Sequence, residues 1–386
     1  MKVIPYAELS WPQIAKLPRD APLAIPLGLD RYDLAQAAGR GRAGPLVVLP
    51  PIPYGFPRRD RHPLGDLAVG DGLLRRVLRG VTRELRKQGF GRVFYLDAHG
   101  LGRRLRDAGL RFVAAPAEPP ADVPWPEDLG RRVVVVSTGH TEQHGHHLPT
   151  GTDTVIVQAI ADGLAEAAPA DVIGLPAWPY GVSTHTRQFP GTLSIGGRVF
   201  EDFFLGILAR WVALGAEMIY FSNAHGGNHS FLVNVVKLAG ERWPHVFTAT
   251  EYLHTTGPAL ERLRQSKRGG MGHGGELETS YLLSLRPDLV DMSRAAVETE
   301  FISTPGYYMD WIEGGRLIAN PPWSDDTQTG IYGDATLATP EKGKQWLAAA
   351  VREKLESIAE IREQHERRTA KRRAARSGSV GRAPPY

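Results

Sequence analysis

The sequence of 386 residues contains no cysteine. Disulfide bonds, cysteine-ligated zinc, iron–sulfur clusters and thiol catalysis are therefore excluded. No apolar run approaches the roughly 20 residues that a membrane-spanning helix needs, and the first residues lack the apolar core of a signal peptide. We therefore expect a cytoplasmic protein with no membrane partner. The lack of cysteine is consistent with a reducing compartment.

The residues that are present have the composition of a folded protein, with 42% hydrophobic residues, 23% charged residues and a net charge of +4. Positive charge gathers in residues 367–386. Such a segment either binds nucleic acid or another acidic partner, or is a solvated terminus. Because no aromatic residue is interleaved with its basic residues before Tyr386, we expect a disordered tail and no nucleic-acid partner.

Two parts of the sequence resemble each other at an offset of 126 residues. Leu49–Gly55 matches Leu175–Gly181, and Asp97–Gly100 matches Asn223–Gly226. In both parts an apolar strand ends in Pro-Tyr-Gly. An amphipathic helix and a second strand follow, and the second strand leads into Ala-His-Gly. Strands that alternate with helices predict parallel α/β sheets.

Upstream of these matches the offset falls to 111 residues, because Ala24–Gly28 pairs with the strand Val133–Val136 and with Gly139. The first copy is therefore shorter, and a segment rich in proline separates it from the second copy. Segments of this kind act as semi-rigid spacers. We expect a degenerate copy, a linker, a complete domain and a basic tail, in residues 1–118, 119–128, 129–366 and 367–386.

Three polar loops contain the residues suited to chemistry, and they span residues 137–153, 222–229 and 269–280. The first two follow apolar strands, and ligands gather at the carboxyl ends of the strands in an open parallel sheet. Histidine and carboxylates together suit zinc, manganese or iron. A single histidine beside glycine is usually a surface residue, but three such loops in one chain favour a metal site.

Four segments of this chain resemble motifs of the creatininase family. They are Thr141–Asp153, Phe189–Ser194, Asn223–Asn228 and Gly272–Ser280, and the match covers residues 132–285. The resemblance implies a three-layer α/β/α domain with two divalent metal ions per chain, either Zn, Mn or Fe. It also implies a homo-oligomer that cleaves a C–N bond of a small-molecule substrate with a metal-activated water. Cyclic amides, formamides and small peptide-like amides all stay open as substrates.

The matched positions imply a role for each site residue. Glu142 and His225 would hold one ion, His144 would hold the other, and Asp153 would bridge the two. His273 and Glu278 would position substrate or transfer protons, and Glu278 is also a candidate metal ligand. Whether Glu276 or Glu278 reaches the metal stays open. Candidate substrate contacts are His140, Trp178, Tyr180 and His185.

The sequence also departs from the family pattern. Gly227 stands where creatininase has an acidic residue, which argues against creatinine as the substrate. His140 replaces a small residue of the family signature. In the first copy, Arg31 and Asp33 align with Glu142 and His144, so we expect the first copy to bind no metal. The alternative function is a non-catalytic metal-binding or scaffold protein with the same fold.

Overall fold

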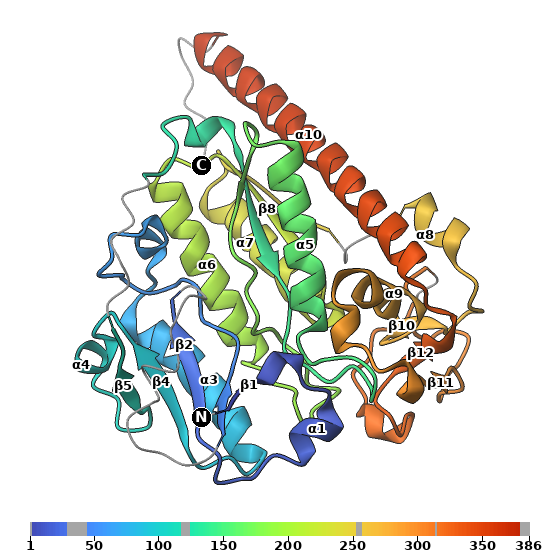
Figure 1. The fold of residues 1–386 in the computed structure, drawn as a ribbon. Coiled ribbons are helices and arrows are strands. Elements are labelled where there is room, and N and C mark those ends of the chain that lie inside the picture. The colour runs from blue at the N-terminus through green and yellow to red at the C-terminus, as the bar shows by residue number, and fades with distance from the viewer. Residues whose placement is uncertain (1, 29–44, 117–123, 252–256, 313–314, 379–386) are drawn as a thin grey trace.

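The computed structural model describes residues 2–28, 45–116, 124–251, 257–312 and 315–378. Residues 2–116 form a front lobe around one parallel sheet, and residues 124–378 form a rear lobe around another (Figure 1). The front sheet has the strand order β1 (Val3–Pro5), β3 (Leu46–Val48), β2 (Leu23–Leu27), β4 (Val93–Asp97), β5 (Phe112–Ala114). The rear sheet has the order β7 (Val172–Gly174), β6 (Val133–Thr138), β8 (Met218–Asn223), β9 (Phe247–Thr250).

A small antiparallel sheet and the helices complete the fold. The small sheet has the order β10 (Met271–His273), β12 (Tyr332–Asp334), β11 (Val297–Glu298). The front-lobe helices are α1 (Trp11–Ala15), α3 (Asp71–Lys87) and α4 (Leu101–Leu105). The rear-lobe helices are α5 (Thr152–Ala167), α6 (Gly197–Ala213), α7 (His229–Arg242), α8 (Pro258–Leu263), α9 (Glu276–Leu285) and α10 (Pro340–Gly378).

The rear lobe is a three-layer α/β/α domain, as the sequence predicts. Side chains of a strand alternate between the two faces of its sheet. Val133 and Val135 of β6 belong to the core under α5, α9 and α10. Val134 and Val136 belong to the core on the opposite face, with α6 and α7. Both faces of β6 are therefore buried, which explains its continuous run of valines.

The central strands of the two sheets pair in the same register. In the front lobe, Leu23 pairs with Val93, and in the rear lobe Val134 pairs with Ile219. Leu23 and Val134 differ by 111 positions, and Val93 and Ile219 differ by 126. These are the two offsets found in the sequence. The segment before each Pro-Tyr-Gly motif bonds to the central strand of its lobe in the same way. Ile52 N donates to Pro26 O of β2, and Trp178 N donates to Ser137 O of β6. The strands around the two Pro-Tyr-Gly motifs therefore have the same local geometry.

The two lobes share one hydrophobic core, which lies between α3 and α6. Glycines allow this close approach. A Cβ at Gly80 would lie 3.3 Å from Ile195, and a Cβ at Gly206 would lie 3.0 Å from Val69. Gly55 has φ +97°, and a Cβ there would lie 2.6 Å from the ring of Phe203. The lobes therefore pack through buried side chains rather than through a loose linker.

Helix α10 extends further than the sequence predicts. The sequence predicts a disordered tail over residues 367–386, but α10 continues to Gly378. His365 bonds to Glu217 (2.9 Å), and Arg372 Nη1 donates to the carbonyl oxygen of Pro244 (3.0 Å). These contacts hold the basic segment against the rear lobe. Residues 379–386 lie outside the described residues.

Residues 119–123 of the expected linker also lie outside the part of the chain that the structure describes. Its continuation packs tightly, because the rings of Trp125 and Trp211 have centroids 4.7 Å apart. Among the described helices, none is both long and apolar enough to cross a membrane.

Candidate metal centre

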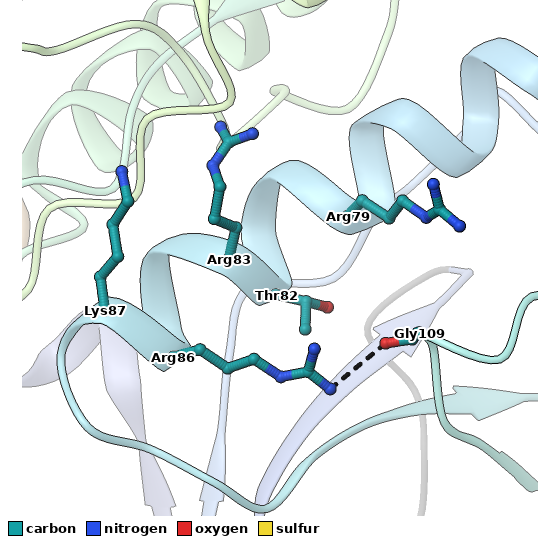
Figure 2. Close-up of a pocket in the computed structure, with 6 residues that line it drawn as sticks. All are labelled: Arg79, Thr82, Arg83, Arg86, Lys87 and Gly109. Atoms are coloured by element: carbon teal, nitrogen blue, oxygen red, sulfur yellow. Dashed lines mark hydrogen bonds between the residues drawn. The ribbon is translucent and has the colours of Figure 1, made fainter.

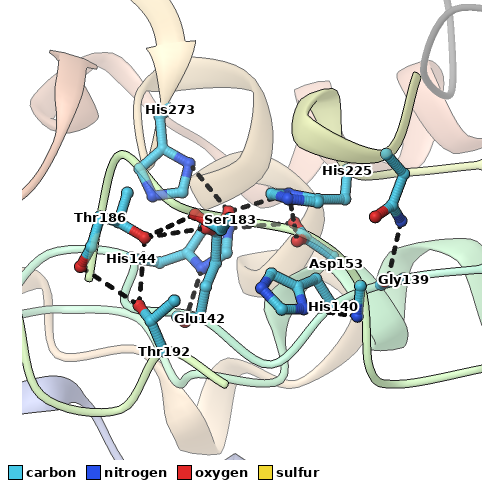
Figure 3. A network of polar contacts seen from close by, with 12 residues as sticks. Gly139, His140, Glu142, His144, Asp153, Ser183, Thr186, Thr192, His225 and His273 are labelled. Atoms are coloured by element: carbon cyan, nitrogen blue, oxygen red, sulfur yellow. Dashed lines mark hydrogen bonds and ion pairs between the residues drawn. The ribbon is translucent and has the colours of Figure 1, made fainter. Parts of the chain in front are cut away.

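Six ionisable side chains gather at the carboxyl end of the rear sheet, and Figure 3 shows all of them except Glu278. Glu142 and His144 come from the loop after β6, and His225 comes from the loop after β8. The other members are Asp153 in the first turn of α5, His273 at the end of β10 and Glu278 in the first turn of α9. All six are buried.

Asp153 lies between two imidazoles. Its Oδ1 is 3.0 Å from His144 Nε2, and its Oδ2 is 3.2 Å from His225 Nδ1. His225 Nδ1 is also 2.9 Å from Glu142 Oε1. The first turn of α5 can approach because residue 139 is glycine, where a Cβ would lie 2.6 Å from Thr154 Cα. One carboxylate therefore faces two histidines from different loops.

Glu278 and His273 complete the cluster. Glu278 Oε2 lies 3.9 Å from His144 Nε2, and His273 Nδ1 lies 3.7 Å from Glu142 Oε1. Glu276 points elsewhere, since it forms an ion pair with Lys342 (2.5 Å). Of the two acidic residues at the start of α9, only Glu278 faces the other members of the cluster.

Hydrogen bonds to carbonyl oxygens fix the tautomers of three histidines. His144 donates from Nδ1 to Glu142 O (3.1 Å), His225 from Nε2 to Val182 O (3.0 Å), and His273 from Nε2 to Gln143 O (2.7 Å). A carbonyl oxygen can only accept, so in each neutral ring the other nitrogen has a free lone pair. That nitrogen faces the carboxylates, which is the usual arrangement of a metal-binding histidine.

The electrostatics of the cluster suit cations. Burial raises the pKa of Asp153, but His144 and His225 outweigh burial and hold that pKa below its usual range. Burial raises the pKa of Glu278 to about 7 and lowers the pKa of His273 to about 3. Among the described residues, no lysine or arginine pairs with Glu142, Asp153 or Glu278. The donor set of carboxylates and imidazoles therefore fits divalent metal ions.

A cavity of about 520 Å³ opens beside the cluster. The cluster residues on its wall are Glu142, His225, His273 and Glu278, and His185 lies beside them. The rest of the wall is largely apolar and aromatic, from Phe231, Tyr307, Tyr308, Trp311, Leu317 and Trp323. Its described lining residues include neither lysine nor arginine. The cluster therefore lies at one end of a pocket that suits an apolar group.

A second hollow lies on the front lobe along α3 (Figure 2). Its described lining residues are Arg79, Thr82, Arg83, Arg86, Lys87 and Gly109, and Arg86 donates to the carbonyl oxygen of Gly109 (3.3 Å). This lining contains no histidine or carboxylate. It therefore lacks the donor set of a metal centre.

The front lobe supports the loop of the metal centre. Thr150 N donates to Leu9 O, and Gly151 N donates to Ala7 O, both at 2.9 Å. Trp11 Nε1 donates to Thr329 O (2.7 Å), and the ring of Trp11 packs on His146 with centroids 4.9 Å apart. The chain segment that leads to Asp153 is therefore held by residues from the beginning of the sequence, which sequence reasoning missed.

Comparison with known proteins agrees with this geometry. The family model Creatininase, described as creatinine amidohydrolase, matches residues 7–112 and 122–358. The chain belongs to the creatininase family. Solved structures share this creatininase fold. The structure of creatininase with Mn has a TM-score of 0.52 at 24% identity, over 63% of this chain and 97% of that chain.

Two relatives within the creatininase family have different named activities. The mycofactocin precursor peptide peptidase of Mycolicibacterium smegmatis is 32% identical over 223 residues, which cover 57% of this chain and 81% of the relative. The creatinine amidohydrolase of Pseudomonas putida is 28% identical over 247 residues, which cover 60% of this chain and 90% of the relative.

The structure explains why this creatininase-family chain lacks the acidic residue at position 227. A Cβ at Gly227 would overlap the carbonyl oxygen of Val182 and lie 2.6 Å from His225 Nε2. A side chain there would disturb the bond that orients His225. The carboxylate near His144 comes instead from Glu278.

The predicted substrate contacts divide into two groups. His185 lines the cavity, and Tyr307 to Trp311 contribute to its wall. Trp178 and Tyr180 do not line it. Trp178 packs on Phe203 with ring centroids 4.2 Å apart, and Tyr180 donates to the carbonyl oxygen of Pro50 (2.6 Å). These two side chains therefore belong to the core between the lobes, and we correct their assignment. His140 is buried behind the cavity wall.

Three further side chains line the cavity that the sequence did not predict: Phe231, Leu317 and Trp323. Phe231 follows the Asn-Ala-His-Gly loop closely in the sequence, so its position in the first turn of α7 was an available signal. Leu317 and Trp323 lie in a segment without periodic pattern, where no sequence signal points to the cavity.

Proposed function

We propose that this chain is a hydrolase that cleaves a C–N bond and holds two divalent metal ions. The observation that carries the proposal is Asp153, whose two oxygen atoms face His144 and His225 separately. In this proposal Glu142 and His225 hold one ion, while His144 and Glu278 hold the other. When bound, such ions lower the pKa of a water molecule and polarise the substrate carbonyl.

Other side chains have supporting roles in this proposal. Thr186 Oγ1 donates to Glu142 Oε2 (3.2 Å) and so orients that carboxylate. Asn223 accepts from His225 N (3.2 Å) and donates to His225 O (2.8 Å), so it fixes the loop on which His225 lies. His273 and His185 lie on the cavity wall, where they can orient the substrate amide.

The substrate we propose is a peptide or a similar amide with a bulky apolar group. The cavity is large, and its aromatic wall offers more apolar area than a compact polar ring such as creatinine can cover. Among the described lining residues there is neither lysine nor arginine, so the wall away from the candidate metal centre offers no such cation to a substrate carboxylate. One named relative cleaves a precursor peptide, which is consistent with this class.

The first experiment is elemental analysis of freshly purified protein, followed by a screen of amides. We expect two transition-metal ions per chain and hydrolysis of peptide-like amides with apolar side chains. Protein that contains no metal and takes up none when zinc, manganese or iron is added contradicts the proposal. Metal binding without hydrolysis of any amide favours the alternative, a non-catalytic metal-binding protein.

An exposed apolar side chain of the cavity wall tests the substrate class. Leu317 is 56% exposed and lines the cavity. Replacing Leu317 by Ser is expected to raise KM about 10-fold for an apolar amide, since a lost apolar contact costs about 1.5 kcal/mol. The KM of a simple formamide is expected to stay unchanged.

Ile302 gives the matched control for this variant. It is 70% exposed but does not line the cavity. Ile302→Ser is therefore expected to leave both KM values unchanged. Equal KM values for wild type and Leu317→Ser would show that the apolar substrate group does not bind at this wall.

We also propose that the front lobe is a degenerate copy of the rear domain that binds no metal. The equal strand registers and the repeated Pro-Tyr-Gly motif support this relation. His99 is the one proposed ligand that the first copy retains, and its Nδ1 accepts from Arg59 N (3.3 Å). Arg31 and Asp33 lie outside the described residues. A homo-oligomer stays a prediction.

A further inference from the structure

His140 differs from the other histidines near the metal centre in the hydrogen bond of its outer nitrogen. His144, His225 and His273 each donate to a carbonyl oxygen, so their other ring nitrogen, which faces the carboxylates, can offer a lone pair to a cation once it is unprotonated. His140 does the opposite, because its Nδ1 accepts from the backbone N–H of Gly181 at 2.8 Å. An imidazole nitrogen that accepts has no proton, so the ring proton of His140 is on Nε2.

This Nε2–H is buried and has no hydrogen-bond partner among the described residues. A ring nitrogen of His140 lies within 4.8 Å of a Glu142 oxygen and of a His225 nitrogen. The rings of His140 and His225 have centroids 4.6 Å apart. Figure 3 shows the nitrogen that is not bonded to the backbone on the side of the ring toward Glu142. A buried donor without an acceptor is costly, so an acceptor is needed there.

We propose that His140 is not a metal ligand and that its Nε2–H donates a hydrogen bond to the oxygen of the attacking water. This inference rests on the proposed hydrolase function. The neighbours of this donor are Glu142 and His225, which hold one ion in the proposed function. A donor fixed by Gly181 holds the water with a lone pair toward the substrate carbonyl.

Two other roles for His140 fit the contacts less well. As a ligand through Nε2, the ring would have to carry its proton on Nδ1, where two N–H groups would face each other at 2.8 Å and Gly181 N–H would lose its acceptor. As a direct substrate contact, His140 would have to line the cavity, but it is fully buried and absent from the wall. Donation to a water within the cluster keeps the bond from Gly181 N–H and does not require His140 to line the cavity.

The first test is independent of activity. In protein loaded with NMR-active cadmium and isotope-labelled histidine, cadmium is expected to couple to nitrogens of His144 and His225 but not to His140. His140 is assigned from the resonance that His140→Asn removes, and it is expected to show a protonated Nε2. Coupling between cadmium and His140 overturns the proposal. Protein that takes up no metal contradicts the proposed function, whereas the proton position on His140 is still measured.

The second test uses two substitutions that separate the nitrogens of the ring. His140→Asn keeps an acceptor for Gly181 N–H but removes the inner donor, and His140→Gln places an amide N–H near the position of Nε2. Removing one donor to a reacting oxygen typically costs about 100-fold in kcat. We expect this loss for His140→Asn, with KM and metal content unchanged, and substantial recovery of kcat in His140→Gln.

Several results would contradict the assignment. An unchanged kcat in His140→Asn would show that the donor is not used. Loss of a metal ion in that variant would make His140 a ligand. A raised KM with unchanged kcat would place the donor on the substrate rather than on the water.

Discussion

Replacing Asp153 by Asn is expected to abolish metal binding and hydrolysis together. The two carboxylate oxygens of Asp153 lie 3.0 Å from His144 and 3.2 Å from His225, so both proposed ions depend on this residue. An amide has one acceptor oxygen and no charge, and it cannot join two cations. Loss of Lewis-acid catalysis costs several kcal/mol, which corresponds to a fall in kcat/KM of about 1000-fold or more.

The measurement is metal content after exhaustive dialysis, together with kcat/KM on the best amide of the screen. Asp162→Asn is the matched control, because Asp162 lies on the same helix, is exposed, and accepts only from Gln158 Nε2 among the described contacts (2.8 Å). The control is expected to retain both ions and full activity. If Asp153→Asn still holds two ions with unchanged affinity, the bridging role is wrong.

Removing residues 1–128 is expected to leave a rear lobe that does not fold. The shared core would lose the side chains of α3 and of the front sheet. This loss would expose Ile195, Phe203 and Trp211 to solvent. Each large apolar side chain exposed costs about 1.5–3 kcal/mol. Domains have only about 5–15 kcal/mol of stability in total, so exposure of several such side chains exceeds it.

The experiment is expression of residues 129–386 alone, judged by near-ultraviolet circular dichroism and metal content. Co-expression of residues 1–128 as a separate chain is expected to restore a folded, metal-binding complex, because the missing cover is supplied in trans. An isolated rear lobe that folds cooperatively and binds two ions would contradict the shared-core interpretation. In that case the front lobe would be a separate domain.

Much of the fold could be predicted from sequence because its signals are local. The valine run of β6 and the polar loop that follows it indicate a buried strand that ends at a site. The offsets of 111 and 126 residues predict equal strand pairing, and the structure has that pairing. The end of α10 was placed too early because its last turns are basic and look like a solvated tail. Their contacts with Pro244 and Glu217 come from distant sequence.

The site was predicted less completely, and two kinds of residue show why. Trp178 and Tyr180 lie near the predicted loops but point into the core. The repeated Tyr of Pro-Tyr-Gly, Tyr54 in the first copy, was a signal of that structural role, because the first copy lacks the other site residues. The contribution of Trp11 had no such signal, since its partner Thr329 is 318 residues away. Contacts at that separation depend on the tertiary fold.

The contact between Trp11 and Thr329 also orders events during synthesis of the chain. Residues 7–11 hold the loop before Asp153, and Trp11 also bonds to Thr329, which is made 318 residues later. Domains generally fold as the chain emerges, from the N-terminus onward. The front lobe can therefore form early, but the loop before Asp153 gains its full support only after Thr329 has left the ribosome. In the proposed function, a product that stops before Thr329 therefore lacks part of the support of the candidate metal centre.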